Sequence, residues 1–182
     1  QPAGGQPQGA VPANVKPPDF SDAGNATVFT GLYQNDLIFV DALGWLWWNG
    51  SKWERDDHKA MTWALDLSAR MLKEARDAHR VALQQQAEAQ ARYMEDGDEE
   101  ARAALDEAKE AAKRANAYLK HAQALRGAPR LKNMLELAKP ALVLKAAKLD
   151  ANPLELNTPA GIVNLTTGQL RPHDRFSYCS KI

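Results

Sequence analysis

The sequence predicts an α+β fold: a mostly helical domain with a small Trp-rich antiparallel β-meander, a long antiparallel helical hairpin and a C-terminal β-hairpin. Three observations predict this fold. Residues 37–55 contain short aromatic and β-branched runs separated by turn signals, a pattern typical of strands. From about residue 57 to residue 125, apolar residues recur every three to four positions, as on helices, with a break at residues 96–98. Residues 160–172 return to a strand–turn–strand pattern.

The composition indicates about one globular domain. The 182 residues are 45% hydrophobic and 25% charged with zero net charge, which excludes a basic nucleic-acid coat and an acidic disordered tail. Cys179 is the single cysteine, so the sequence excludes an internal disulfide framework and a multi-cysteine zinc site. No apolar run approaches the length of a membrane span, and the first residues lack a signal-peptide pattern. We therefore expect a cytoplasmic protein without a membrane partner.

Residues 1–18 differ from the rest of the chain. They hold five of the ten prolines and three of the eleven glycines, with Lys16 as their only charged residue. Such a segment buries too little apolar surface to offset the entropy of ordering it. We expect a flexible linker over residues 1–18 and the folded domain over residues 19–182. The linker is either a tether to an upstream domain or a frayed terminus.

A short helix is expected next, from Asp22, which is placed to cap it, to about residue 34, with an apolar stripe that includes Phe29 and Tyr33. The meander follows, as the runs LIFV, WLWW and SKWER. Asn49-Gly50 is a two-residue hairpin signal between the second and third runs. Because side chains alternate along a strand, Trp45 and Trp47 should share one face, and Leu46 and Trp48 the other.

All five tryptophans fall within 19 residues. Such a cluster suits stacking on sugars or nucleic-acid bases. A thin sheet also needs large side chains to build a core, and each tryptophan buries on the order of 150–250 Å². We interpret the cluster as core, with both faces of the sheet covered. Its members are Trp45, Trp47, Trp48, Trp53 and Trp63.

Two long helices are expected after the meander, over residues 57–93 and 98–125, because Asp96-Gly97-Asp98 combines a helix breaker with a capping residue. They form a hairpin whose outer half is mostly alanine, glutamine and charged residues. We expect its tip, residues 80–110, to protrude and to be mobile. The arm, residues 78–117, is either a partner-binding element or a solvated insertion held by its own helix propensity.

The remaining elements are shorter. A helix should start at Pro129 and stop or kink at Pro140, and ALVLKAAKL is expected to continue as a short helix. Residues 160–172 should form a β-hairpin with its turn at Thr167-Gly168.

Charge is unevenly distributed. Residues 95–107 contain seven acidic residues and one basic residue, whereas residues 109–148 contain ten basic and two acidic residues. A basic block of this kind can neutralise several DNA phosphates, although helix surfaces are often rich in lysine and arginine without binding anything. Our candidate phosphate contacts are Lys109, Lys113, Arg114, Lys120, Arg126, Arg130 and Lys132.

Catalytic patterns are missing from the sequence. It contains no phosphate-binding loop, no G-x-S-x-G elbow and no histidine pair at metal-ligand spacing. We expect His58, His79 and His121 to be solvated on helix surfaces, and His173 to help anchor the C-terminal hairpin. Cys179 has no base near it in the sequence. We therefore expect no catalytic site, no metal and no cofactor in this chain.

Four motifs, in order, resemble the domain that precedes the superfamily 3 helicase motor in phage and plasmid primase-helicases, which also occurs in the poxvirus primase-helicase. They are DAGNA before a short helix and LIFV; WLWWNGSKWERDD; RLKNMLELAKP; and LDANPLELNTPAGIVNLTTGQLRPHD. Residues 78–117 depart from the family pattern. The motif residues are Asp22, Gly24, Asn25, Trp45, Trp48, Gly50, Trp53, Asp150, Asn157, Gly161, Gly168, Pro172 and His173.

The resemblance implies a parent polypeptide with a priming domain upstream and a hexameric helicase motor downstream, the motor using ATP and magnesium. It implies that this chain is a non-catalytic accessory domain, encoded by a phage or plasmid and working in a bacterial cytoplasm. We expect it to form a collar on the motor, to contact the DNA backbone, and to assemble as a hexamer only with the motor. The alternative is a protein-interaction module whose arm recruits a replication partner or a neighbouring subunit.

Overall fold

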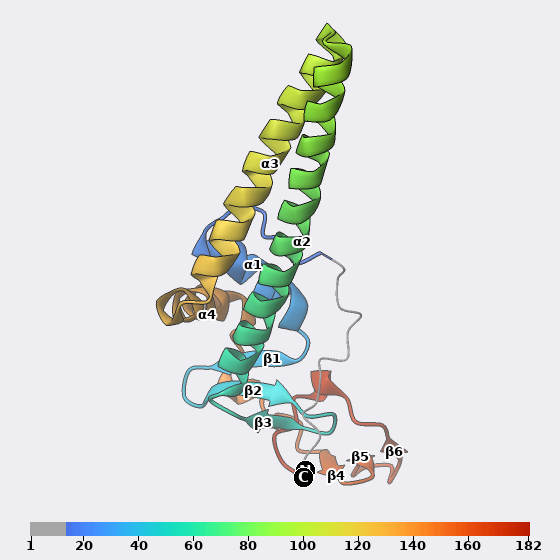
Figure 1. Cartoon of the computed structure of the whole chain (residues 1–182). Coiled ribbons are helices and arrows are strands. Elements are labelled where there is room, and N and C mark those ends of the chain that lie inside the picture. The colour runs from blue at the N-terminus through green and yellow to red at the C-terminus, as the bar shows by residue number, and fades with distance from the viewer. Residues whose placement is uncertain (1–13) are drawn as a thin grey trace, which may run out of the picture.

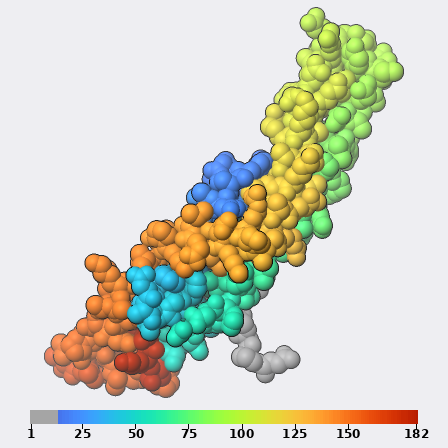
Figure 2. Space-filling model, turned by 90° about the vertical axis from the view of Figure 1, so that its left-hand side faces the viewer, coloured from blue at the N-terminus to red at the C-terminus, as the bar shows by residue number. Residues whose placement is uncertain are grey.

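The computed structural model describes residues 14–182 (Figure 1). It is an α+β domain with two separate three-stranded antiparallel sheets, ordered β1-β2-β3 and β4-β5-β6, which confirms the expected fold class. The arm lies at one end of the molecule and the C-terminal sheet at the other (Figures 1 and 2). The elements are α1 (Asp22–Tyr33), β1 (Leu37–Val40), β2 (Gly44–Trp48), β3 (Trp53–Arg55), α2 (Lys59–Asp96), α3 (Glu99–Leu125), α4 (Ala128–Leu142), η1 (Ala146–Lys148), β4 (Glu155–Thr158), β5 (Gly161–Asn164), β6 (Leu170–Arg171) and η2 (Arg175–Ser177).

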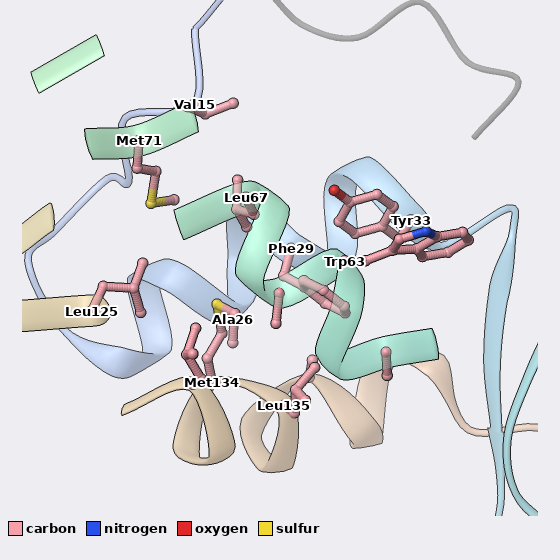
Figure 3. Packing of buried hydrophobic residues seen from close by; sticks show 14 of the residues in the cluster. Val15, Ala26, Phe29, Tyr33, Trp63, Leu67, Met71, Leu125, Met134 and Leu135 are labelled. Carbon is pink, nitrogen blue, oxygen red and sulfur yellow. The ribbon is translucent and has the colours of Figure 1, made fainter. Parts of the chain in front are cut away.

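The main hydrophobic core lies where α1, α2, α4 and the end of α3 near the body of the domain meet (Figure 3). Phe29 of α1, Leu67 and Met71 of α2, Leu125 of α3 and Met134 of α4 are fully buried in it. The apolar stripe of each helix faces this cluster, because residues three and four apart lie on one side of a helix. This core fixes the position from which the arm extends.

The meander has two buried faces, as its alternation predicts. Trp45 and Trp47 face the main core, whereas Leu46 and Trp48 belong to a second cluster with Trp53. Trp45, Trp48, Trp53 and Trp63 are at most 8% exposed and Trp47 is half-buried, which confirms the core interpretation.

The turn between β2 and β3 is longer than the expected two residues. Trp48 pairs with Trp53, so residues 49–52 form a four-residue loop. The Asn49 side chain sets this length, because its Oδ1 accepts hydrogen bonds from the backbone N–H of both Ser51 and Lys52. Gly50 takes a positive φ of 101° in this loop.

The arm is a helical hairpin of α2, with 38 residues, and α3, with 27 residues. Gly97 adopts the left-handed conformation that ends α2, and the Asp98 side chain caps α3 by accepting from the N–H of Ala101. At 1.5 Å per residue α2 is about 57 Å long. The hairpin therefore extends well beyond the core, as expected (Figure 1). Small buried residues such as Ala82, Ala101 and Ala112 lie along α2 and α3.

The end of α4 and the segment after it differ from two expectations. Of the two expected effects of Pro140, a stop or a kink, the stop is wrong, because Pro140 lies inside α4 and the helix ends two residues later, at Leu142. The expected short helix over ALVLKAAKL does not form, because Val143 bridges to Phe39 of β1 and the Leu144 N–H donates to the Phe39 carbonyl at 2.8 Å. Leu144 thereby enters the second hydrophobic cluster, and only the three residues of η1 are helical.

The C-terminal hairpin forms as predicted from β5 and β6, and the structure adds β4, which the sequence analysis missed. The residues of β4, ELNT, carry little strand propensity, so this strand depends on its pairing with β5. Gly161 at the start of β5 has a φ of 142°, and a Cβ there would lie 2.3 Å from the Arg171 carbonyl oxygen. This position therefore requires glycine.

Most of the predicted linker, residues 1–13, lies outside the described residues. Residues 14–18 lie against the helices. The Val15 side chain is 3% exposed in the main core, and its N–H donates to the Glu74 carboxylate at 2.9 Å. The packed structure thus includes residues before the expected boundary at residue 19.

Candidate nucleic-acid interface

The seven predicted phosphate contacts lie on three surfaces rather than one. Lys109, Lys113 and Lys120 are four and seven residues apart, so they share one face of α3. Arg114 is about 100° around the helix from Lys113, on the side of Tyr118. The third group lies where the chain turns from α3 into α4 and consists of Arg126, Arg130 and Lys132.

Some of these cations have acidic partners within the domain. Lys109 pairs with Asp106 at 3.5 Å, Lys113 with Glu110 at 2.5 Å, and Arg130 with Asp22 at 3.6 Å. Within residues 14–182, no carboxylate lies within ion-pair distance of the other four, which are all exposed; these four cations are Arg114, Lys120, Arg126 and Lys132.

A shallow groove runs between α2 and α3 beside the first of these surfaces. Lys109, Lys113 and Asn116 line it from α3, and His79, Leu83 and Gln86 from α2. Its lining combines cations, amides and a half-exposed leucine. Such a surface suits an extended, negatively charged partner better than an enclosed small molecule.

The DAGNA motif serves the core of the domain. Asp22 is not the helix cap that we expected, because Ser21 caps α1. The Asp22 carboxylate instead forms an ion pair with Arg130 and accepts a hydrogen bond from the Asn133 side chain, both from α4. Asn25 is fully buried, and its Oδ1 accepts from His121 Nε2 at 2.9 Å. Gly24 is required because a Cβ there would lie 2.4 Å from the carbonyl oxygen of Asp19.

We expected His121 to be solvated, and this prediction is wrong: the residue is buried, with 7% of its surface exposed. The sequence around His121 does not predict this burial, because the groups that cover the imidazole come from distant residues. They are the Asn25 side chain and the ring of Phe20, which stacks on the imidazole at 5.1 Å between centroids. Burial, followed by the positive charge of Arg130, lowers the pKa of His121, and Asp22 and Asp19 oppose this shift more weakly.

This lowered pKa gives a prediction about pH. The unfolded chain binds a proton at His121 near pH 6.5, whereas the folded chain does so only at lower pH, so stability falls as pH decreases below about 6.5. We expect the melting temperature of the wild type to fall more between pH 7 and pH 5 than that of His121→Gln. His79→Gln, at a half-buried position on α2, should follow the wild type. Parallel curves for the wild type and His121→Gln would contradict the prediction.

The motif residues near the C-terminus hold the last segment against the rest of the domain. Asn157 Nδ2 donates to the carbonyl oxygens of Ser51 and Lys181, both at 2.9 Å, and its Oδ1 accepts from His173 Nδ1 at 3.0 Å. Asp150, at a φ of 51°, accepts from both the N–H and the hydroxyl of Ser180. His173 thus links the segment after β6 to β4.

Cys179 is buried, and burial raises the pKa of its thiol, with the Asp150 and Glu155 carboxylates adding to the effect. A raised pKa keeps the sulfur protonated and weakly nucleophilic. Among residues 14–182, no group of three or more acidic, histidine or cysteine side chains is placed to hold a metal ion. None of the described helices combines the length and the apolar composition that crossing a bilayer requires.

An ion pair that was not predicted from the sequence joins η2 to the segment just before β1. Arg175 Nη1 donates to Asp36 Oδ1 at 2.6 Å and to the Asn35 carbonyl at 3.0 Å. The two charged residues are 139 positions apart, and neither lies in a recognisable pattern. No local signal was available to find this pair.

Fold and site together define an α+β domain whose motif residues hold its own segments together and whose exposed cations surround the base of a helical arm. The family model described as D5 N terminal like matches residues 26–182. The chain belongs to this family, the domain that precedes the superfamily 3 helicase in phage, plasmid and viral primase-helicase proteins. No curated protein and no solved structure matches the chain.

Proposed function

We propose that this chain is a non-catalytic accessory domain that forms a collar on the helicase motor, contacts the DNA backbone and couples priming to unwinding. The observation that carries the DNA contact is a set of four exposed cations around the base of the arm that have no carboxylate within ion-pair distance among residues 14–182: Arg114, Lys120, Arg126 and Lys132. Contacts of this type bind phosphates without reading the base sequence. ATP and magnesium belong to the parent motor, hexamers form with the motor, and the host cytoplasm is the setting.

An apolar face of the C-terminal sheet supports the coupling role. Leu156, Val163 and Leu170 lie side by side across the three strands, and Leu154 lies next to Leu165. The four leucines are 52–56% exposed, whereas the opposite face of the sheet carries Asn157 and the buried Ile162. A solvent-facing sheet surface is normally polar. An apolar face of this kind fits contact with a neighbouring domain of the same polypeptide.

The DNA contact predicts a salt-dependent loss. Replacing Lys120, Arg126 and Lys132 together by alanine should weaken binding of a fluorescein-labelled oligonucleotide at low salt by at least about tenfold. It should also reduce the slope of log K against log salt by about 0.9 for each duplex phosphate contact removed. Fluorescence anisotropy measures both, with single-stranded and duplex probes.

The matched control replaces three exposed lysines elsewhere, Lys145, Lys148 and Lys181, and so removes the same charge. Equal losses in the two variants would mean that net charge alone governs binding, and the proposed contact surface would be wrong. An unchanged affinity in the first variant would have the same consequence.

A second candidate function is favoured by the arm, whose tip extends away from the other elements of the described residues (Figure 1). In this alternative, the arm recruits a replication partner or a neighbouring subunit. Removing residues 80–113 and closing the helices with a glycine turn separates the two functions, because it leaves Arg114, Lys120, Arg126 and Lys132 in place. Lost partner capture with intact DNA binding favours the arm, whereas lost DNA binding with intact capture favours the collar.

A further inference from the structure

α3 carries a stripe of charges that changes sign along the helix. Glu99, Asp106, Lys113 and Lys120 are spaced seven residues apart, so they lie along one face over three heptads. All four are exposed, with 63% of the Asp106 side chain and 73% of the Lys113 side chain accessible. The two acidic members lie near the tip and the two basic members nearer the core.

The ends of this stripe cannot neutralise each other within one chain. Glu99 and Lys120 are 21 residues apart on a single helix, which is about 32 Å at 1.5 Å per residue. Asp106 and Lys113 each form an ion pair with a side chain one turn away on the same helix, Lys109 and Glu110 respectively. The side chains of both pairs are largely accessible to solvent, so they can change partners when a second molecule approaches.

We infer that the arm pairs with the arm of a second copy of this chain, with the two α3 helices antiparallel and the charged stripes facing each other. A two-fold axis midway between Asp106 and Lys113 places Glu99 opposite Lys120 of the other copy, and Asp106 opposite its Lys113. The same axis places Lys109 opposite Glu110 of the other copy. Every charged pair in this register has opposite signs, and the symmetry makes each contact twice.

The surface beside the stripe is shaped for such a partner. The shallow groove between α2 and α3 lies beside the middle of the stripe, at Lys113, and Leu83 contributes a side chain to it that is 48% exposed. In Figure 2 the yellow surface of α3 faces the viewer along most of the arm. Two arms paired in this way form an antiparallel four-helix arrangement. In such bundles, residues seven apart on one helix face the same neighbouring helix.

This inference is independent of the DNA contact. Lys113 and Lys120 are nevertheless also candidate phosphate contacts, so DNA and the second arm should compete for them.

Charge exchange tests the pairing. Glu99→Lys with Asp106→Lys makes the stripe wholly basic, and Lys113→Glu with Lys120→Glu makes it wholly acidic. By sedimentation velocity at low salt, the wild type should associate into a dimer of about twice 20.0 kDa that dissociates at high salt. Each variant alone should associate at least tenfold more weakly, and an equimolar mixture should restore the dimer.

The matched control is Glu100→Lys with Glu107→Lys, which reverses two charges on the same helix one position further around it. It should dimerise like the wild type. A wild type that stays monomeric at all salt concentrations, a mixture that fails to associate, or a control that loses the dimer would each overturn the inference. If the wild type is monomeric and the Lys113→Glu, Lys120→Glu variant binds DNA more weakly, the arm pairing is wrong and the DNA contact is supported.

Discussion

Replacing Trp53 with alanine should lower the free energy of unfolding by about 3–5 kcal/mol. Trp53 is 2% exposed and lies between Trp48, at 5.8 Å between ring centroids, and Tyr178, at 6.3 Å. Its indole Nε1–H donates to the Arg175 carbonyl at 2.8 Å, and its backbone N–H donates to the Cys179 carbonyl at 2.8 Å. One side chain thus joins the meander to the C-terminal segment, so alanine leaves both a cavity and an unpaired carbonyl.

Urea denaturation followed by far-ultraviolet circular dichroism measures this loss without relying on tryptophan fluorescence. The matched control is Trp47→Ala in the neighbouring strand, because Trp47 is half-buried and covered on one side by Lys59. Its loss should be about half as large or less. Trp53→Phe keeps most of the ring and loses the indole hydrogen bond, so it should cost about 1–2 kcal/mol. Equal losses for Trp53→Ala and Trp47→Ala would show that burial does not govern the effect.

The elements that follow from local patterns could be predicted from the sequence. The alternation of Leu46 and Trp47 fixes which face of the meander each residue takes, because a strand has a side-chain period of two. Gly97 and Asp98 supply the end of one helix and the cap of the next, so the hairpin needs no long-range information. Both features depend on neighbours within a few positions.

Features that depend on distant segments could not be predicted in this way. β4 exists because it pairs with β5, and its own residues do not favour a strand. His121 looks like a surface residue on its helix until Asn25, 96 positions earlier, and the Phe20 ring cover it. Leu144 does not form the expected helix, because its backbone N–H donates a hydrogen bond to the carbonyl of Phe39 in β1. In each case, tertiary contacts outweigh local propensity.

The candidate interface shows the same division. The sequence identifies the basic block, because charge is a property of single residues. It does not show that Arg130 forms an ion pair with Asp22, because that pair depends on the packing of α4 against α1.

Removing Arg175 is expected to destabilise the domain by about 3–5 kcal/mol, because it leaves the Asp36 carboxylate buried without a cation. The Asp36 side chain is 7% exposed and that of Arg175 is 22% exposed. Arg175→Met retains the aliphatic part of the side chain and removes its charge. The double variant Asp36→Asn, Arg175→Met should recover at least half of the loss, because an amide costs less to bury than a carboxylate. Urea denaturation of all four proteins completes a double-mutant cycle.

The loss in Arg175→Met should also depend on pH, in a direction opposite to that of His121. Burial raises the pKa of Asp36 even in the wild type, and Arg175 opposes this shift. Without Arg175 the folded pKa rises further above the unfolded value of about 3.9, so the folded chain holds a proton that the unfolded chain releases. The variant should therefore be closest to the wild type near pH 4 and weaken as pH rises above the unfolded pKa. In Asp36→Asn, Arg175→Met this trend should disappear, since no carboxylate remains to titrate. A deficit that is constant with pH, or that persists in the double variant, would mean that the lost hydrogen bond to the Asn35 carbonyl, rather than the stranded charge, accounts for the effect.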